Sequence, residues 1–490
     1  MKVLFIYPDV IGWGSSWYGF YYLGISHIIS AVEAAGHEAS LFHAFQPPKK
    51  RRLFEAIDRI SPDIIGFSST TNLFPYVREW VAWIREEYST PIVCGGIHPT
   101  IMPKEVIGVE GIDYVVIGEG EAPMVELCDA IERGGETLTI KNVWARQGSE
   151  ISKNPLRPLV SDLDVLPYPD RIKFNYMKIG PGRHNAGIFS ASRGCPYDCY
   201  YCCNHTLKNI YGEKQYVRFR SPENVITEIE QVCSSFPSID KILFDDDILP
   251  LKKKWFREFT NLYKTRIALP FTCNSRVEVI DDETAHLLKE DGCIKVQFGV
   301  ESGNPRIRRE MLGRNHSNDT IIKASERLRD VGIQVHSFNI VGMPGERVKD
   351  VLDTIKLNSL IMPSSVQVSI LYPYPKTEIY DITKEMNLLK PNAGTTYFKK
   401  SCLKLPGLSG GRLNFLVRYF KTLYKLYRFC PPGSTRENFL DRLITNRLIG
   451  FTLMPLLSAF KGTTKWIELS IRGLKRRIKS LSLKQQEYLS

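Results

Sequence analysis

Three cysteines in one short stretch constrain this chain more than any other feature. The segment S-R-G-C-P-Y-D-C-Y-Y-C-C-N begins at Ser192 and places Cys195, Cys199 and Cys202 in a C-x3-C-x2-C array. Thiolates this close in sequence can surround one small inorganic core, and such soft ligands select zinc, cuprous copper or an iron–sulfur cluster. A closed structural zinc site needs four ligands. Three thiolates therefore favour a cubane cluster with one iron left open, over the alternative of spare buried cysteines.

A doubly wound parallel sheet is predicted for residues 1–135, because short apolar runs alternate there with helical stretches such as Leu23–Ala35 and Tyr76–Glu87. Ligands of such sheets lie beyond the carboxyl ends of the strands. The expected strands are Val3–Tyr7, Ala39–His43, Ile64–Ser68, Ile92–Cys94 and Tyr114–Ile117.

The same alternation resumes after residue 187, and most of the expected strands end in polar phrases. These strands are Ile188–Ser192, Lys241–Asp245, Phe271–Asn274, Lys295–Gly299, Val335–Val341 and Val366–Leu371. The first enters the cysteine loop, and later ones end in F-D-D-D-I-L, N-S-R, G-V-E-S-G and N-I-V-G-M-P-G-E. Side chains at the carboxyl ends of barrel strands meet at one face, so we expect these phrases to surround the cysteine loop.

The cysteine array and the strand-end phrases resemble the radical S-adenosylmethionine family. The resemblance implies a partial (β/α)6 TIM-type barrel and a 4Fe-4S cluster held by the three cysteines. It also implies a set of residues that bind S-adenosylmethionine. The matching positions are Tyr201, Asp246, Asp247, Glu301, Ile340, Gly342 and Glu346. Three of them have a structural alternative: a solvated acidic turn or helix cap for Asp246 and Asp247, and an ordinary barrel-rim carboxylate for Glu301. Lys376 stands where the family usually has glycine, and no residue is assigned as catalytic.

Two phrases of the first domain, C-G-G-I-H-P-T at 94–100 and D-Y-V-V-I-G-E-G-E at 113–121, resemble the cobalamin-binding domain that precedes the barrel in one radical-SAM subgroup. The implied cobalamin contacts are Ser68, Gly95, Gly96, His98, Gly118 and Glu119. The D-x-H-x-x-G motif that supplies a cobalt ligand in methionine-synthase-type domains is absent. The sequence therefore predicts no protein histidine below the cobalt, and a degenerate domain without cobalamin stays an alternative.

The expected domains are 1–135 (cobalamin-binding, Rossmann-like), 136–187 (hairpin at Val143–Ile151, then a proline-rich linker), 188–400 (barrel) and 401–490 (basic and mostly helical). Residues 407–490 contain 16 of the 65 Lys and Arg but only 4 of the 53 Asp and Glu. Leu413–Phe429 has helical periodicity, Leu448–Phe460 is a short apolar run, and Trp466–Leu481 reads as a basic amphipathic helix. Such a helix fits an anionic membrane surface or packing on the barrel; no RNA-binding module is recognised.

The resemblance implies an enzyme that reductively cleaves S-adenosylmethionine to a 5′-deoxyadenosyl radical and, with cobalamin, methylates an unactivated carbon of a small-molecule or lipid substrate. Alternatives are an oxidative or ring-forming radical reaction, a tRNA methylthiotransferase, and a non-enzymatic sensor. A flavodoxin or ferredoxin is the expected electron donor. The odd number of cysteines, 11, and the strand-like first residues predict a cytoplasmic protein, with peripheral membrane contact as an option.

Overall fold

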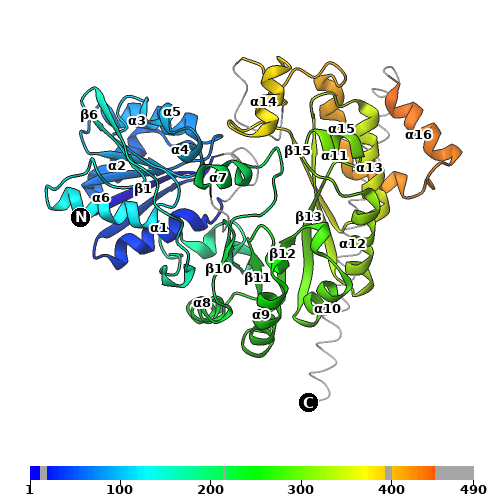
Figure 1. The fold of residues 1–490 in the computed structure, drawn as a ribbon, viewed down its shortest axis with the longest axis horizontal. Coiled ribbons are helices and arrows are strands. Elements are labelled where there is room, and N and C mark those ends of the chain that lie inside the picture. The colour runs from blue at the N-terminus through cyan, green and yellow to red at the C-terminus, as the bar shows by residue number, and fades with distance from the viewer. Residues whose placement is uncertain (11–18, 213–215, 392–399, 447–490) are drawn as a thin grey trace.

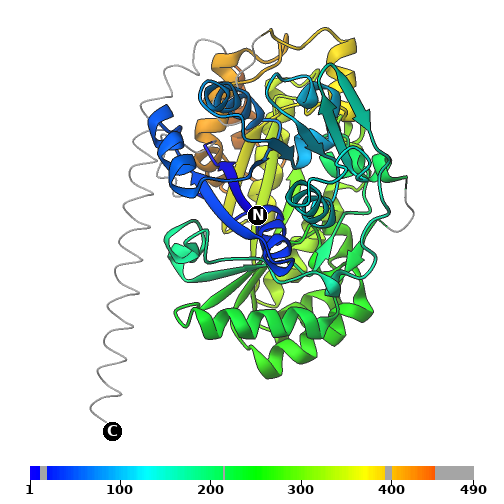
Figure 2. The same cartoon turned by 90° about the vertical axis from the view of Figure 1, so that its left-hand side faces the viewer.

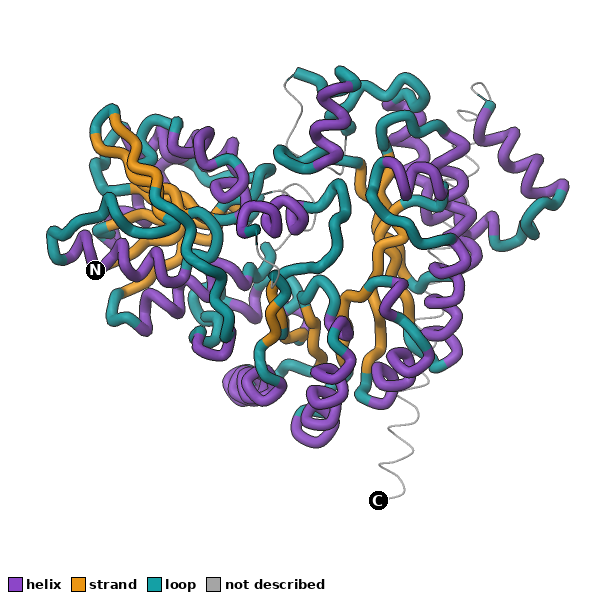
Figure 3. Tube along the Cα trace, in the orientation of Figure 1, coloured by secondary structure: helices purple, strands orange, loops and turns teal. Residues whose placement is uncertain are grey.

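The computed structural model describes residues 1–10, 19–212, 216–391 and 400–446, which build two mainly parallel sheets flanked by helices (Figure 1). The N-terminal sheet occupies one side of the molecule and the second sheet the other. Helix α7 (Cys203–Tyr211) lies between them, as the tube view also shows (Figure 3).

The N-terminal sheet has the strand order β2-β1-β3-β4-β5-β6-β7. Its first five strands pair in parallel, which confirms the predicted doubly wound sheet, and β6 and β7 add an antiparallel hairpin at one edge. The strands are β1 (Lys2–Pro8), β2 (Glu38–Ala44), β3 (Ile64–Ser68), β4 (Ile92–Gly95), β5 (Tyr114–Val116), β6 (Val143–Gln147) and β7 (Glu150–Lys153). The helices are α1 (Leu23–Ala34), α2 (Lys50–Ile60), α3 (Phe74–Arg85), α4 (Ile97–Ile101), α5 (Pro103–Ile107) and α6 (Glu121–Glu132).

The second sheet has six parallel strands in the order β15-β14-β13-β12-β11-β8, so consecutive strands are neighbours and the sheet curls into a half-barrel. The strands are β8 (Ala186–Phe189), β11 (Lys241–Phe244), β12 (Phe271–Ser275), β13 (Cys293–Glu301), β14 (Gln334–Val341) and β15 (Ser365–Ile370). The helices are α8 (Pro222–Ser235), α9 (Lys253–Arg266), α10 (Asp282–Glu290), α11 (Pro305–Glu310), α12 (Asn318–Asp330), α13 (Val348–Ile361) and α14 (Glu378–Glu385). Figure 2 views the molecule from the side of the first domain, which stands in front of part of this sheet.

The first barrel strand is shorter than the sequence predicts. Strand β8 ends at Phe189, and Ser192–Arg193 form a separate short strand, β9, that pairs with β10 (Arg218–Phe219). The chain leaves the sheet here because the peptide N–H of Ala191 donates to the Asp246 carboxylate instead of to a neighbouring strand. The cysteine loop therefore starts from its own two-stranded stem.

The linker has no α-helix or β-strand between Asn154 and Asn185, but it forms short 3-10 turns at Leu163–Val165, Tyr176–Lys178 and Gly182–His184, and it is held by buried charge. The Arg171 guanidinium donates to a Glu228 carboxylate oxygen at 2.7 Å and to the Ile188 carbonyl at 2.8 Å. Glu228, only 1% exposed, also pairs with Arg220. Apolar residues of the linker, including Phe174, continue the core of one domain into that of the other. The two sheets therefore share one hydrophobic core.

The predicted helix in the C-terminal region is confirmed as α15 (Gly410–Tyr427), followed by α16 (Thr435–Thr445). Helix α15 packs on α13 and β15 through a core that includes Leu413, Phe420 and Leu423. Its apolar face is thus covered by the barrel. The two later segments of the prediction, Leu448–Phe460 and Trp466–Leu481, lie outside the described residues. Within the part of the chain that is described, no helix has the length and apolar character needed to span a bilayer.

Lys376 adopts a positive φ of 65°, which explains why glycine suits this position. A left-handed conformation costs an L-residue about 1–2 kcal/mol, so Lys376→Gly should raise the midpoint of thermal unfolding by about 2 °C. The control is Lys384→Gly, an exposed position inside α14, where glycine should lower the midpoint. A fall in both variants would contradict the strain argument. Differential scanning calorimetry measures both.

Candidate functional site

The cysteine loop lies at the carboxyl end of the half-barrel, between β9 and α7. Cys202 is the residue before the first turn of α7, and its N–H donates to the Cys199 carbonyl at 3.0 Å. The loop is tied to later parts of the barrel through Tyr200, whose N–H donates to the Leu312 carbonyl and whose carbonyl accepts from the Ile379 N–H. These backbone bonds fix the positions from which the three sulfur atoms project.

Asp246, at the end of β11, anchors the stem of this loop. It is 2% exposed; its carboxylate accepts from the Ala191 N–H at 3.0 Å and from the Ser192 hydroxyl. Burial raises the pKa of Asp246 to about 6, and the bonds to Ser192 and Ala191 oppose that rise. Its neighbour Asp247 reaches water and accepts from the Asn204 amide at 3.0 Å. The two predicted carboxylates therefore have different surroundings, and only that of Asp247 leaves room for a ligand.

Glu301 lies beside the cysteine loop, as the sequence predicts. Its carboxylate accepts from the Tyr201 hydroxyl at 2.9 Å and lies 3.7 Å from an Arg314 guanidinium nitrogen. Burial raises the pKa of Glu301, against the effects of Arg314 and Tyr201. Glu301 also has a positive φ of 59°. Strained non-glycine residues of this kind cluster at functional sites, so the backbone and the side chain both mark this position.

Glu346 stabilises the loop after β14, the fifth strand of the half-barrel, by accepting hydrogen bonds from its backbone. One carboxylate oxygen accepts from the Gly342 and Met343 N–H groups, and the other oxygen is buried without a partner. Burial raises the pKa of Glu346 to about 8. Ile340, the third predicted position here, packs in the same apolar cluster as Tyr201. All seven predicted S-adenosylmethionine residues thus belong to the cysteine loop or to the carboxyl ends of barrel strands.

The spacing of the three cysteines fits a cluster better than a single ion. Among the described residues, one set of three His, Cys, Asp or Glu side chains has all its ligand atoms within 4.8 Å of one another, and it contains no cysteine. At least one pair among the sulfurs of Cys195, Cys199 and Cys202 is therefore separated by more than this distance. They still interact electrostatically with one another. Three thiolates separated in this way suit a multi-atom iron–sulfur core.

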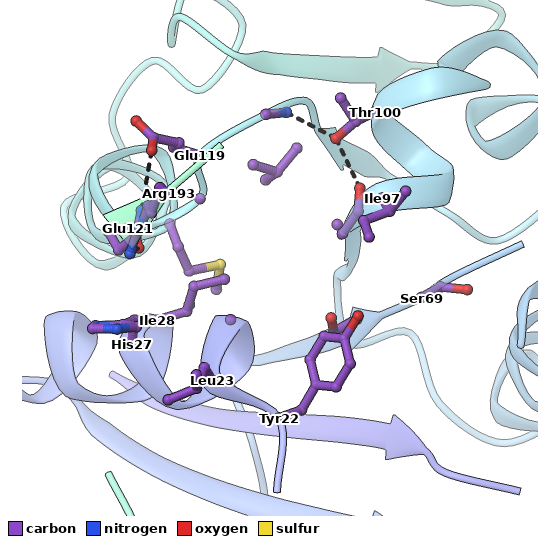
Figure 4. A pocket seen from close by; sticks show the side chains of 18 of the residues that line it. Tyr22, Leu23, His27, Ile28, Ser69, Ile97, Thr100, Glu119, Glu121 and Arg193 are labelled. Carbon is purple, nitrogen blue, oxygen red and sulfur yellow. Dashed lines mark hydrogen bonds and ion pairs between the residues drawn. The ribbon is translucent and has the colours of Figure 1, made fainter. Parts of the chain in front are cut away.

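A cavity of about 380 Å³ lies between the carboxyl edge of the N-terminal sheet and the stem of the cysteine loop (Figure 4). Its lining includes five of the six residues predicted to contact cobalamin: Ser68, Gly95, Gly96, Gly118 and Glu119. The sixth, His98, does not line it; that side chain is buried against Phe74 and bonds to the Thr71 hydroxyl. The structure therefore brings the glycine phrases together and leaves the histidine out.

At two positions that line this cavity, any residue with a Cβ would clash with neighbouring atoms, so glycine is required. Gly96 has a φ of 101°, and a Cβ there would lie 2.8 Å from the Ser69 carbonyl oxygen. Gly118 has a φ of 80°, and a Cβ there would lie 1.8 Å from the Tyr211 hydroxyl. A backbone without side chains permits close approach of a large ligand. These glycines let protein backbone and the Tyr211 side chain pack closely at the rim of the cavity, which could take part of a cobalamin lying across the strand ends.

Ion pairs join the cavity to the cysteine loop. Arg193, two residues before Cys195, donates to Glu119 at 3.1 Å and to Glu121 at 2.6 Å, as Figure 4 shows for the first of these pairs. Arg218 donates to the same Glu119 oxygen at 2.9 Å. Burial acts to lower the pKa of Arg193, but the two glutamates raise it overall. The wall between the two sites is therefore a network of buried and half-buried charges.

The sequence argument missed the barrel residues that line the cavity, among them Arg193, Tyr211, Tyr216 and Arg218. Arg193 adjoins the cysteine motif, which is the one sequence signal that could have drawn attention to it. Helix α7 reaches the cavity because it packs against α4, and the Tyr211 hydroxyl accepts from the Glu119 N–H at 2.9 Å. No periodicity predicts such a contact between domains.

Comparison with known proteins agrees with this architecture. Residues 189–357 match the model of the Radical SAM superfamily, and residues 17–128 match that of the B12 binding domain. An uncharacterized methyltransferase of Pyrococcus horikoshii is 31% identical over 68% of this chain and 72% of its own length. The chain therefore belongs to the radical-SAM enzymes that carry a B12-binding domain. Its cofactors are a 4Fe-4S cluster, S-adenosylmethionine and cobalamin.

Two further comparisons agree with this assignment. The anaerobic magnesium-protoporphyrin IX monomethyl ester cyclase of Rubrivivax gelatinosus is 25% identical over 80% of this chain and 74% of its own. The structure of the methyltransferase TsrM from Kitasatospora setae, with cobalamin and a [4Fe-4S] cluster bound, has the same fold. Its TM-score is 0.63, with 20% identity over 79% of this chain and 75% of that one.

The raised pKa of Glu346 predicts a pH-dependent stability. Its folded pKa of about 8 exceeds the usual value of about 4.3, so the folded protein binds more protons than the unfolded one between these values. Stability should therefore fall as the pH rises through this window, by at most about 1.4 kcal/mol per pH unit. Glu346→Gln keeps an acceptor oxygen for the two N–H groups and removes the titration. Thermal unfolding midpoints from pH 6 to 9 should fall less in the variant; parallel curves would contradict the assignment.

Proposed function

We propose that this protein is a cobalamin-dependent radical-SAM methyltransferase that methylates an unactivated carbon. When bound, the three cofactors supply a 5′-deoxyadenosyl radical and a transferable methyl group. The observation that carries the proposal is the shared wall of the two sites: the stem of the cysteine loop and α7 line the cobalamin cavity themselves. Methyl transfer to a substrate radical requires that both cofactors reach one chamber, and two adjoining sites that share a wall support this proposal.

The residues of the chain supply position and shielding. Asp247, which reaches water beside the loop, is our candidate for the ammonium group of S-adenosylmethionine. Asp246 is committed to the loop stem, so it acts on that ligand only through the loop. Glu301, held by Tyr201 and next to Arg314, presents a second carboxylate. The Gly342 region, stiffened by Glu346, offers backbone for the adenine, in line with the resemblance.

A second candidate reaction keeps the cofactors and omits methyl transfer. The cyclase relative of Rubrivivax gelatinosus, named for ring formation, motivates an oxidative or ring-forming radical reaction. The tRNA methylthiotransferase alternative would need three further cluster cysteines before the barrel. Only Cys94 and Cys128 occur there, and both are buried in the core of the sheet. The described cysteines therefore do not support that reaction.

Product analysis separates the two candidate reactions. The protein is reconstituted anaerobically, reduced, and incubated with S-adenosylmethionine and candidate substrates. Wild-type protein should form both 5′-deoxyadenosine and S-adenosylhomocysteine, and Cys199→Ala should lose at least 100-fold in deoxyadenosine because the cluster loses a ligand. Cys430→Ala, at the far end of α15, is the control and should keep both products. Deoxyadenosine without S-adenosylhomocysteine would support the ring-forming alternative, and neither product would reject both.

We also propose that the basic C-terminal residues contact an anionic membrane surface, with a lipid as one substrate class. Eight of the 16 cationic residues of the tail lie within 461–490. Each lysine or arginine near an anionic surface contributes about 1 kcal/mol to binding. Protein lacking residues 461–490 should float less with vesicles that contain phosphatidylserine, whereas neither form should float with phosphatidylcholine alone. Equal recovery of both forms with anionic vesicles would end the membrane proposal.

A further inference from the structure

One of the three cysteines has surroundings unlike those of the other two. The Cys199 sulfur accepts a hydrogen bond from Nη1 of Arg276 at 3.0 Å, and both side chains belong to residues that are only 7% exposed. Cys195 and Cys202 instead lie near the carboxylate of Asp247. Within the cysteine loop, Cys199 therefore lies beside a cation, whereas Cys195 and Cys202 lie near a carboxylate.

Arg276 is held in place by groups that leave it little freedom. Its Nε and Nη2 donate to the two oxygens of Glu278 at 3.3 and 2.6 Å, and its guanidinium carbon lies 3.7 Å from the centroid of the Tyr197 ring. Glu278 is itself held by Nδ1 of His316 at 3.0 Å. The N–H that faces the sulfur is therefore oriented in advance, before any ligand arrives.

A second guanidinium lies near Cys199. Burial acts to lower the pKa of Arg314, but Tyr201, Glu301 and the Cys199 sulfur raise it above its usual value. Arg314 is 7% exposed and donates to the Gly299 carbonyl at 2.7 Å. Two buried cations thus flank one sulfur, where a hydrogen bond acts in a medium that screens charge poorly.

We propose that Arg276, through its hydrogen bond to the Cys199 sulfur, is a positioning residue that raises the reduction potential of the cluster. Hydrogen bonds to cluster sulfurs are among the factors that set such potentials. The cluster gains one electron and one unit of negative charge when a low-potential one-electron donor reduces it, and no bond forms or breaks. A fixed N–H donor beside a ligand sulfur stabilises the more negative state. The proposal depends on the cluster and not on which reaction follows.

The test is a redox titration of the reconstituted full-length protein without S-adenosylmethionine. Dithionite is the reductant, and electron paramagnetic resonance monitors the reduced cluster. Arg276→Met should lower the midpoint potential by about 59 mV, which corresponds to a tenfold change in a one-electron equilibrium. Arg276→Lys keeps the charge with a poorer donor geometry and should shift less. Arg266→Met is the control, because Arg266 ends α9 at the opposite end of the strands; it should leave the potential unchanged.

If Arg276→Met fails to assemble a cluster, a variant that removes a negative charge near Cys199 can still test the proposal. Glu278→Gln removes such a charge and retains an acceptor for Arg276, so it should raise the midpoint potential. Iron and sulfide analysis establishes that each variant holds a full cluster. Unchanged midpoints in Arg276→Lys and Glu278→Gln would overturn the proposal. A loss of S-adenosylmethionine binding by Arg276→Lys at an unchanged potential would also overturn it, and would assign Arg276 to the ligand carboxylate instead.

Discussion

The bonds from the Asp246 carboxylate to the stem of the cysteine loop fix the geometry on which the whole site depends. They take the chain out of the sheet directly after β8, so the loop projects over the open end of the half-barrel. Burying a carboxylate that is 2% exposed is costly unless hydrogen bonds satisfy its oxygens, and the Ala191 N–H and the Ser192 hydroxyl supply these bonds. From this stem the chain places three thiols, the start of α7 and Arg193 in one wall.

The same wall joins the two domains. Glu119 accepts from Arg193, from Arg218 and from the Val160 N–H, so the cobalamin domain, the loop stem and the linker meet at one carboxylate. Removing one partner of such a buried network costs more than the network contributes net, because the remaining charges stay buried. Two features therefore hold the domains together around the site. One is this set of ion pairs, which would cost free energy to break, and the other is the apolar core that runs from one sheet to the other.

The sequence predicts the two sheets, the order of their strands along the chain and the loop that carries the cysteines. This was possible because parallel strands buried on both faces appear as apolar runs with polar ends. It also assigned Tyr201 and Glu301 to one ligand site, and the structure brings their side chains into contact. It did not separate the surroundings of Asp246 from those of Asp247, since adjacent residues of one strand end look alike in sequence. It missed Arg276 as a partner of Cys199 and Tyr211 as a partner of Gly118, because both contacts join residues more than 70 positions apart. The inclusion of His98 followed from its neighbours in the glycine phrase, and the fold turns that imidazole into the protein.

The close approach of Gly118 to Tyr211 limits which substitutions either position can accept. A methyl group at position 118 would overlap the ring hydroxyl of a helix from the other domain. Position 118 can therefore accept a side chain only in a sequence that has already lost the tyrosine at 211. A smaller residue at 211 gives up the hydroxyl that now accepts from the Glu119 N–H. A change at either position therefore alters the constraint on the other, and the φ of 80° at Gly118 adds a separate preference for glycine.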